Sequence, residues 1–563
     1  MTPAHLLAHF DRLADAPDAV PRLRRFVLDL AVRGKLVLQD PADEPAADLL
    51  KRIAAQFIKH GDKKDRTPFT PDEDEVPYTV PPGWTWSRFD EVASIESNLV
   101  KPQDFADHPH IAPDNIEGRT GRLLPYQTIR ESKVFSAKHR FFPGQIVYSK
   151  IRPALAKVAP VDFEGLCSAD MYPIRPLIDR GYLLRYMLSE VFVTQSVKED
   201  TRVAMPKINQ EALAKILVAV PPFAEQRRIV AKVDELMARC DSLEAAQTER
   251  ESRRDRLVSA SLQRLNQLAE DVTAFRDHAR FALDNLPRLA TRPEHVTQLR
   301  QTILNLAVRG KLVPQDPKDE AVSELLKRIE ALEKPPRYAS RSCELIVGDC
   351  GLSIGDPKTP LPDRWQRVPM VEIARLESGH TPSRNRSDWW GGEIAWMGLV
   401  DARRHHGGVI TETIQYTNPQ GIANSAARVL PAGTVCFSRT ASVGYVVIMG
   451  KPMATSQDFV NWVPTEAVSS RWLQLVLIAE KPALSRFSKG AVHQTIYYPA
   501  WLSMHIVLPP LAEQHRIVAK VDELIALCDK LEAQLATAQA ESHRLLEAVL
   551  HEALGASLGE TTS

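Results

Sequence analysis

The chain has 563 residues, 44% of them hydrophobic and 25% charged, and its 71 lysines and arginines balance 71 aspartates and glutamates. This composition excludes a disordered chain, predicts three or four globular units, and requires any nucleic-acid surface to be local. The sequence shows no secretory signal, no apolar run of about 18 residues and no C-x-x-C pair among its six cysteines. We therefore expect reduced thiols and a cytoplasmic protein without a membrane span.

Two blocks of sequence each occur twice. Residues 20–55 match residues 296–331 at 23 of 36 positions, and residues 220–245 match residues 508–533 at 20 of 26. The bodies between the blocks share little identity, and the periods are too long for a solenoid, so the pattern indicates a duplicated half-molecule. Two like surfaces can bind two copies of one partner, while two unlike bodies bind two unlike targets. The alternative is a duplicated scaffold whose bodies have only drifted apart.

The first block predicts two helices around a turn. One helix covers residues 21–32 and stops near Gly34, and the other covers residues 46–55, with its counterpart at residues 322–332. Lys35, in the turn GKLVxQDP, follows no glycine-rich loop. A structural or partner-docking turn is therefore favoured over a phosphate site.

The first body alternates short strands with loops. Its strand at residues 145–148 ends in a loop, and loops on a rigid scaffold commonly carry recognition residues. From Arg119 to Lys157 the sequence holds nine cations and one anion. This excess predicts a phosphate-binding surface, the alternative being a solvated basic face. The candidate DNA-contacting residues of this body are Arg119, Arg122, Lys133, Lys138, Arg140, Ser149, Lys150, Arg152 and Lys157.

The second block predicts a long helix in each half. Prolines at 221–222 and 509–510 precede apolar residues spaced alternately four and three apart, as in a coiled-coil seam. The pattern extends over about 35–40 residues, or roughly 50–60 Å. A helix with one apolar stripe needs a partner, and the other copy in the same chain is the natural one. Ordinary bundle helices are the alternative.

The second body carries a weaker charge signal, with fourteen cations and nine anions in residues 364–505. Trp389, Trp390 and Trp396 either stack on bases or belong to the core and the strand ends. The strand at residues 434–437 leads into a loop, as in the first body. The candidate DNA-contacting residues here are Thr381, Ser383, Arg384, Arg386, Ser438, Arg439, Thr440 and Lys489.

Signatures of catalysis are missing from the sequence. It holds no nucleotide-binding G-x-x-x-x-G-K-[ST] or G-x-G-x-x-G motif, and residues 220–223 (VPPF) lack the polar residue of an [NDS]-P-P-[YF] amino-methyltransferase motif. His405 and His406 have no third ligand at metal spacing. We expect no catalytic residue, no metal and no cofactor bound by this chain. The rival interpretations are an enzyme with a diverged motif and an adaptor that bridges two partner copies without reading DNA.

The repeated motifs LAVRGKLVxQDPxDE and PPxAEQxRIVAKVDEL resemble the conserved regions of type I restriction–modification specificity subunits, and GHTPS at 379–383 resembles the opening of their target-recognition domains. The resemblance implies an α+β fold: two mixed α/β target-recognition domains separated by long antiparallel coiled-coil helices, with an internal pseudo-twofold repeat. Each domain is expected to read one half of a bipartite, asymmetric DNA site, and the helices to set the spacing. Methyl transfer is expected from two methyltransferase subunits that carry S-adenosylmethionine, and restriction from subunits that use ATP and Mg.

The resemblance also assigns a docking role to segments 30–37, 224–236, 306–313 and 512–524, which are expected to bind the methyltransferase subunits. The candidate docking residues are Arg33, Lys35, Glu225, Gln226, Arg309, Lys311, Glu513 and Gln514. The expected domains are an N-terminal conserved helical region (1–59), a linker (60–80), a first target-recognition domain (81–219), a central conserved helical region (220–333), a linker (334–360), a second target-recognition domain (361–507) and a C-terminal conserved helix (508–563).

Overall fold

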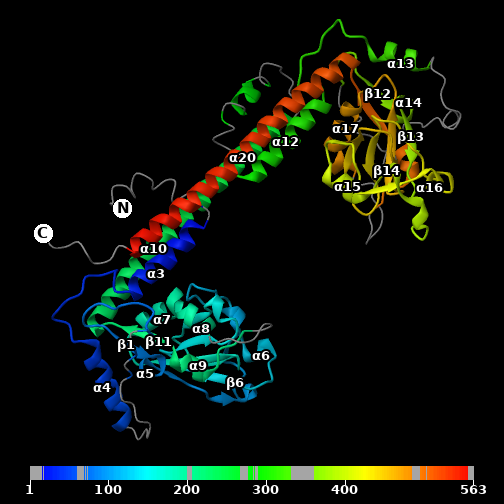
Figure 1. Cartoon of the computed structure of the whole chain (residues 1–563). Helices are drawn as coiled ribbons and strands as arrows, with labels where there is room; N and C mark the ends of the chain where they lie inside the picture. Colours follow the sequence, from blue (N-terminus) through cyan, green and yellow to red (C-terminus); the bar gives the residue numbers. More distant parts are fainter. Residues whose placement is uncertain are drawn as a thin grey trace. The chain divides into compact units, whose positions relative to one another are not determined.

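The chain folds into two compact units. The computed structural model describes residues 16, 18–59, 69, 71–72, 74–198, 206–266, 275, 277–282, 285, 290–330, 361–484, 495–502 and 504–555. One unit is Met1–Glu251 with Gln539–Ser563, and the other is Ser252–Ala538. Each unit contains one mixed α/β domain, called a head below, and parts of two long helices, which confirms the α+β class (Figure 1). No helix within the described ranges is long and apolar enough to cross a membrane.

The first-block helices form where the sequence predicts them. α3 (Ala19–Val32) is followed by Gly34, and α4 (Ala46–Lys59) follows the turn. Gly34 has a φ of 68°, a left-handed conformation that glycine adopts without strain, and a Cβ there would come within 2.4 Å of Pro81. The second copy repeats the arrangement with α12 (Pro293–Val308), Gly310 at a φ of 68° and α13 (Val322–Glu330).

The first head has strands β1 (Thr85–Arg88), β2 (Ala93–Ile95), β3 (Leu99–Val100), β4 (Pro109–Ile111), β5 (Gln127–Thr128), β6 (Lys138–Phe141), β7 (Ile146–Ser149), β8 (Val158–Pro160), β9 (Gly165–Cys167), β10 (Met171–Pro176) and β11 (Leu217–Val220), and helices α5 (Phe89–Val92), α6 (Ile129–Ser132), α7 (Arg180–Leu188), α8 (Glu190–Lys198) and α9 (Gln210–Lys215). β1 pairs antiparallel with β11, which joins the start of the head to its end. Two sheets, in the orders β2-β10-β7-β8 and β3-β6-β9-β4-β5, form the rest.

The second head has strands β12 (Gln366–Pro369), β13 (Ala374–Ser378), β14 (Trp390–Met397), β15 (Val409–Ile410), β16 (Gln415–Thr417), β17 (Val435–Ser438), β18 (Val446–Met449), β19 (Ala454–Thr455), β20 (Phe459–Pro464) and β21 (His505–Leu508), and helices α14 (Met370–Ile373), α15 (Leu399–Arg404), α16 (Pro419–Ala423), α17 (Ser470–Ala479), α18 (Lys481–Leu484) and α19 (Tyr498–Leu502). β12 pairs antiparallel with β21, as β1 does with β11. Sheets in the orders β13-β20-β17-β18-β15 and β16-β14-β19 complete it. The two heads thus share a closing strand pair despite unlike sequences.

The two long helices are α10 (Phe223–Asn266) and α20 (Leu511–Gly555), of 44 and 45 residues. They exceed the predicted 35–40 residues, and at 1.5 Å per residue each extends about 65 Å. α10 begins in the first unit and ends in the second, whereas α20 begins in the second and ends in the first. The chain therefore passes from the first unit to the second along α10 and returns along α20.

Matched ion pairs hold each first-block helix to a long helix. Arg24 Nη2 on α3 lies 2.5 Å from Asp241 Oδ1 and 2.7 Å from Glu244 Oε2 on α10. In the second unit, α12 and α20 make the same two contacts at 2.5 and 2.7 Å through Arg300, Asp529 and Glu532. The first turn of α3 also packs on α20, since Ala19 clusters with Leu546 and Val549. The first-block helices therefore also pack against the apolar stripes of the long helices. The apolar spacing in the sequence did not predict this third element.

The two first-block helices carry different residues at one partly buried polar position. Asn305 on α12 accepts a hydrogen bond from Gln301 (3.0 Å) and donates to Asn266 (3.3 Å). The equivalent residue of α3, 276 positions earlier, is Asp29, whose Oδ1 is buried without a hydrogen-bond partner among the described residues. Burial raises the pKa of Asp29 to about 6, with Arg33 opposing the shift. The first unit therefore holds a carboxylate where the second holds a neutral amide.

The substitution Asp29→Asn should make the stability of the chain less dependent on pH. Because the folded-state pKa of about 6 lies above the ordinary 3.8, the stability that Asp29 contributes is complete below pH 3.8 and is lost as the pH rises through 6. Between pH 5 and 7 the wild-type chain should lose on the order of 1 kcal/mol of unfolding free energy relative to the variant. Urea unfolding across this range measures the difference. The control Asp48→Asn removes an exposed carboxylate, and equal profiles for the two variants would contradict the assignment.

Candidate nucleic-acid interface

A buried tryptophan–glutamate pair fixes the entry of each head to its long helix. Trp84 Nε1 donates to Glu225 Oε2 across 3.0 Å, and Trp365 Nε1 donates to Glu513 Oε2 across 3.0 Å. Burial raises the pKa of both glutamates, and the indole hydrogen bonds oppose this shift by stabilising the charged form. A buried carboxylate is costly unless it is hydrogen-bonded, so the tryptophan at the entry of each body is a structural anchor.

The neighbouring glutamine ties a head helix to the same long helix. Gln226 Oε1 accepts the backbone N–H of Asp179, just before α7, across 2.9 Å. Gln514 Oε1 accepts that of Ser469, just before α17, also across 2.9 Å. Four expected docking contacts are therefore corrected, because these side chains are at most 1% exposed and already bonded inside the chain: Glu225, Gln226, Glu513 and Gln514.

The first-block turn is locked onto the long helix by a second ion pair. Arg228 Nη2 lies 2.5 Å from Asp43 Oδ2, and its counterpart Arg516 lies 2.6 Å from Asp319. The other cations of the turns keep some exposure and make looser contacts. Arg33 lies 4.7 Å from the Tyr78 ring, Lys311 lies 5.6 Å from the Phe275 ring, Arg309 Nη1 donates to the Asn266 carbonyl across 3.1 Å, and Lys35 is half-buried.

The loops after β7 and β17 have matching backbone geometry. Each strand continues into a cation, Lys150 or Arg439, whose backbone N–H donates to the carbonyl of an aspartate, Asp170 at 2.9 Å or Asp458 at 2.8 Å. Each aspartate N–H lies 3.3 Å from the hydroxyl of the serine two residues earlier. Lys207 Nζ adds a contact of 3.1 Å to Asp170 Oδ1. Sequence reasoning missed these aspartates and Lys207, although the repeated Ser-x-Asp at 168–170 and 456–458 signals them.

Most candidate cations of the first head are engaged within the chain. Two expectations are corrected: Lys138 is 6% exposed and donates to Ser136, and Ser149 is 1% exposed, so neither presents its side chain to DNA. Ion pairs join Arg119 to Glu190 (2.8 Å), Arg122 to Asp241 (3.1 Å), Arg140 to Glu164 and Lys157 to Asp114 (3.4 Å). Lys133 and Arg152 are exposed.

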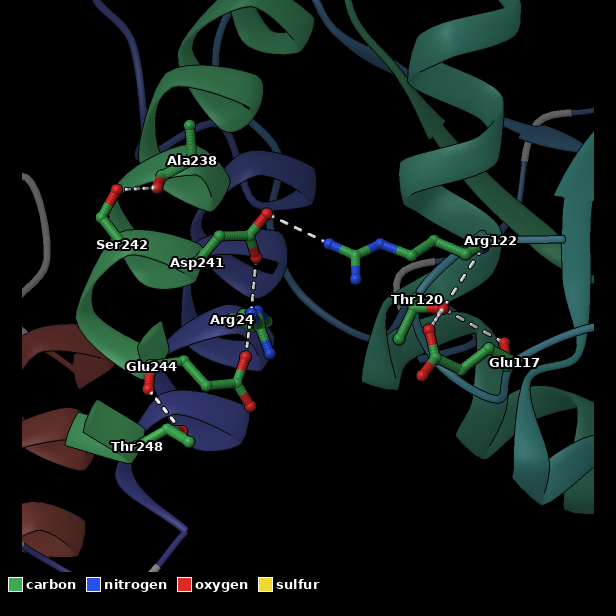
Figure 2. A network of polar contacts seen from close by, with 9 residues as sticks. All are labelled: Arg24, Glu117, Thr120, Arg122, Ala238, Asp241, Ser242, Glu244 and Thr248. Carbon is green, nitrogen blue, oxygen red and sulfur yellow. Dashed lines mark hydrogen bonds and ion pairs between the residues drawn. The ribbon is translucent and has the colours of Figure 1, made fainter. Parts of the chain in front are cut away.

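Arg122 has an internal role that its sequence neighbourhood did not indicate. Figure 2 shows its guanidinium reaching from the first head to Asp241 on α10, the same carboxylate that binds Arg24 of α3. Asp241 thus joins the head, the long helix and the first-block helix. The basic stretch from Arg119 to Lys157 is therefore partly a tether between elements of the first unit.

In the second head the GHTPS segment lies beside the strand-end loop. Thr381 Oγ1 donates to Gln457 Oε1 (2.5 Å), and Arg439 Nη2 donates to the Gln457 carbonyl (3.0 Å). Ser438 is fully buried, which corrects its expected DNA contact. The remaining candidates are placed as follows: Ser383 and Arg384 are exposed, Arg386 is exposed and paired with Asp388 at 2.7 Å, Thr440 bridges to Thr495, and Lys489 lies outside the described residues.

The histidine pair of the second head makes no metal centre. His406 Nδ1 accepts the Val446 N–H across 3.0 Å, and its ring lies 5.7 Å from that of Tyr445. Burial lowers the pKa of His406. Within the described ranges, no three His, Cys, Asp or Glu side chains are grouped so that they could hold a metal ion.

The family described as the type I restriction modification DNA specificity domain matches residues 81–251 and 362–538. The chain belongs to this family. The Escherichia coli EcoDI specificity subunit is 39% identical over 47% of this chain and about half (54%) of its own length, and the E. coli EcoAI specificity subunit is 28% identical over 95% and 94%. A solved chain from a study of type I R-M complex assembly shares the fold, with a TM-score of 0.52 and 21% identity over 85% of this chain and 99% of its own. The function of this specificity subunit is DNA sequence recognition, and it has two domains for this function.

Trp84→Phe should destabilise the first unit by about 1–3 kcal/mol, because it leaves the buried Glu225 oxygen without its donor. Trp365→Phe should act alike on the second unit through Glu513. A double-mutant cycle with Glu225→Gln, measured by denaturant unfolding, tests the pairing. Single effects that add to within about 0.5 kcal/mol would show that the two side chains are not coupled.

Proposed function

We propose that this specificity subunit reads a bipartite, asymmetric DNA site, one half with each head, and carries out no chemistry itself. The matched pair of strand-end loops is the main support for this proposal. Each head presents a cation, Lys150 or Arg439, at the same position of a loop with the same backbone hydrogen bond. Charged donors on such loops bind phosphates or base edges. The unlike side chains around the two loops support two different half-sites.

We assign the chemistry of the complex to other subunits. Two methyltransferase subunits that carry S-adenosylmethionine dock on the two first-block turns, where Arg33, Lys35, Arg309 and Lys311 offer partly exposed cations. Two nearly identical turns on one chain support two copies of one partner. Restriction subunits that use ATP and Mg complete the assembly in the cytoplasm.

Neutralising the first strand-end loop should weaken DNA binding without releasing the partners. Arg152 is exposed and Lys150 keeps 23% of its side-chain area exposed, so Lys150→Gln with Arg152→Gln removes two cations available to phosphate. We expect a weaker complex whose salt dependence, as a log–log slope, falls by about 0.9 for each lost phosphate contact. Titrations at several salt concentrations measure the slope, with Arg239→Gln on α10 as the control. Full DNA affinity in the double variant would favour the adaptor that reads no DNA.

Shortening α10 and α20 together by one heptad should change the spacer between the half-sites and leave both half-site sequences intact. Seven residues correspond to about 10 Å of helix, which is about three base pairs of a duplex whose turn of 10–10.5 base pairs measures roughly 34–36 Å. Mapping of methylated bases in DNA exposed to the complex gives the spacer directly. An unchanged spacer would show that the two helices do not set the distance between the half-sites.

A further inference from the structure

An exposed arginine of the second head lies beside a pair of tryptophan rings. The guanidinium carbon of Arg384 lies 5.4 Å from the ring centre of Trp390 and 5.4 Å from that of Trp396, and these two rings meet edge to face at 5.2 Å. Trp396 is 3% exposed and its Nε1 donates to the His380 carbonyl (3.1 Å). Trp390 Nε1 donates to the Ser383 carbonyl (3.2 Å). Both rings are therefore fixed to the GHTPS loop, and they lie beside a guanidinium that is otherwise exposed.

Two other arginines show what distinguishes Arg384. Arg386, in the same loop, lies 4.9 Å from the Trp389 ring, but Asp388 pairs with it through both carboxylate oxygens at 2.9 and 2.7 Å. In the first head, Arg140 lies 5.1 and 4.9 Å from two phenylalanine rings, but Glu164 neutralises it. Within the described part of the chain, the polar contact of Arg384 is to a neutral acceptor, Gln415 Oε1 at 3.3 Å.

We propose that Arg384 reads a guanine in the half-site of the second head, an inference that rests on the proposed function. A guanidinium presents five N–H donors in a planar fork, and two of them match guanine O6 and N7 in the major groove. A phosphate contact needs a positive charge but no fixed plane, so lysine suffices for it. Contact with two indole rings restricts the Arg384 side chain before DNA arrives, which lowers the entropy lost when both hydrogen bonds form.

The experiment uses the full complex with its methyltransferase subunits and duplexes in which each base pair of the site is varied in turn. Arg384→Lys keeps the charge and removes the fork. We expect binding to the preferred duplex to fall about 5- to 150-fold and the preference for guanine to vanish at one position of one half-site. The control Arg239→Lys, at an exposed position of α10, should keep every base preference. The other half-site, read by the first head, reports that the variant complex is folded and assembled.

A second measurement alters the DNA instead of the protein. The wild-type complex is titrated with duplexes in which 7-deazaguanine, which lacks the N7 acceptor, replaces each guanine singly. One replacement should weaken binding to the wild type and leave binding to Arg384→Lys unchanged. Unaltered base preferences in Arg384→Lys, or a second half-site without guanine, would overturn the inference. An equal loss of affinity for all sequences with a flatter salt slope would also overturn it, because that result marks a phosphate contact. A wild-type complex without any base preference would instead overturn the proposed function.

Discussion

The buried glutamate that opens each long helix is the interaction on which both units depend. A carboxylate in this position loses its hydration, and the Trp84 or Trp365 indole N–H replaces part of it. The adjacent glutamine binds the backbone just before a head helix, so two consecutive side chains hold the start and the middle of one head. Each head is thereby seated on its helix by contacts that involve none of its outer loops. The loops can then differ between the heads without disturbing the contacts that hold each head to its long helix.

The duplicated sequence blocks make the same contacts in both units. The pairs Arg24–Asp241 and Arg300–Asp529, and the pairs Arg228–Asp43 and Arg516–Asp319, place the same charges at equivalent points of the two units. Asp43 and Asp319 keep only 9% and 8% of their side-chain area exposed, but each pair includes one partly exposed side chain, so solvent screens the pair and limits its contribution to stability. Their geometric effect is larger, because they orient a first-block helix and its turn against the long helix in the same way twice. The two first-block turns therefore have the same orientation against the long helix in both units.

In this protein the position of each charged side chain decides its role more than the number of charges does. The stretch from Arg119 to Lys157 holds nine cations and one anion, yet Arg119, Arg122, Arg140 and Lys157 are occupied by carboxylates of the same chain. The second head has no such stretch but offers Arg384, which lies beside two indole rings and donates to a neutral amide oxygen. A base-reading site requires orientation and an open edge, and a phosphate site requires mainly exposed charge. The two heads therefore offer different kinds of contact.

The sequence by itself determined the duplication, the two unlike bodies, the helix–turn–helix of the first block and the existence of the long helices, because repeats, glycine stops and apolar periodicity are local features of the chain. The tertiary structure alone decided which polar residues face solvent. Trp84 and Glu225 are 141 positions apart, and Arg122 meets Asp241 across 119. Burial and pairing depend on such distant neighbours, so Glu225, Gln226, Lys138 and Ser149 look like surface residues in the sequence and become interior ones in the fold.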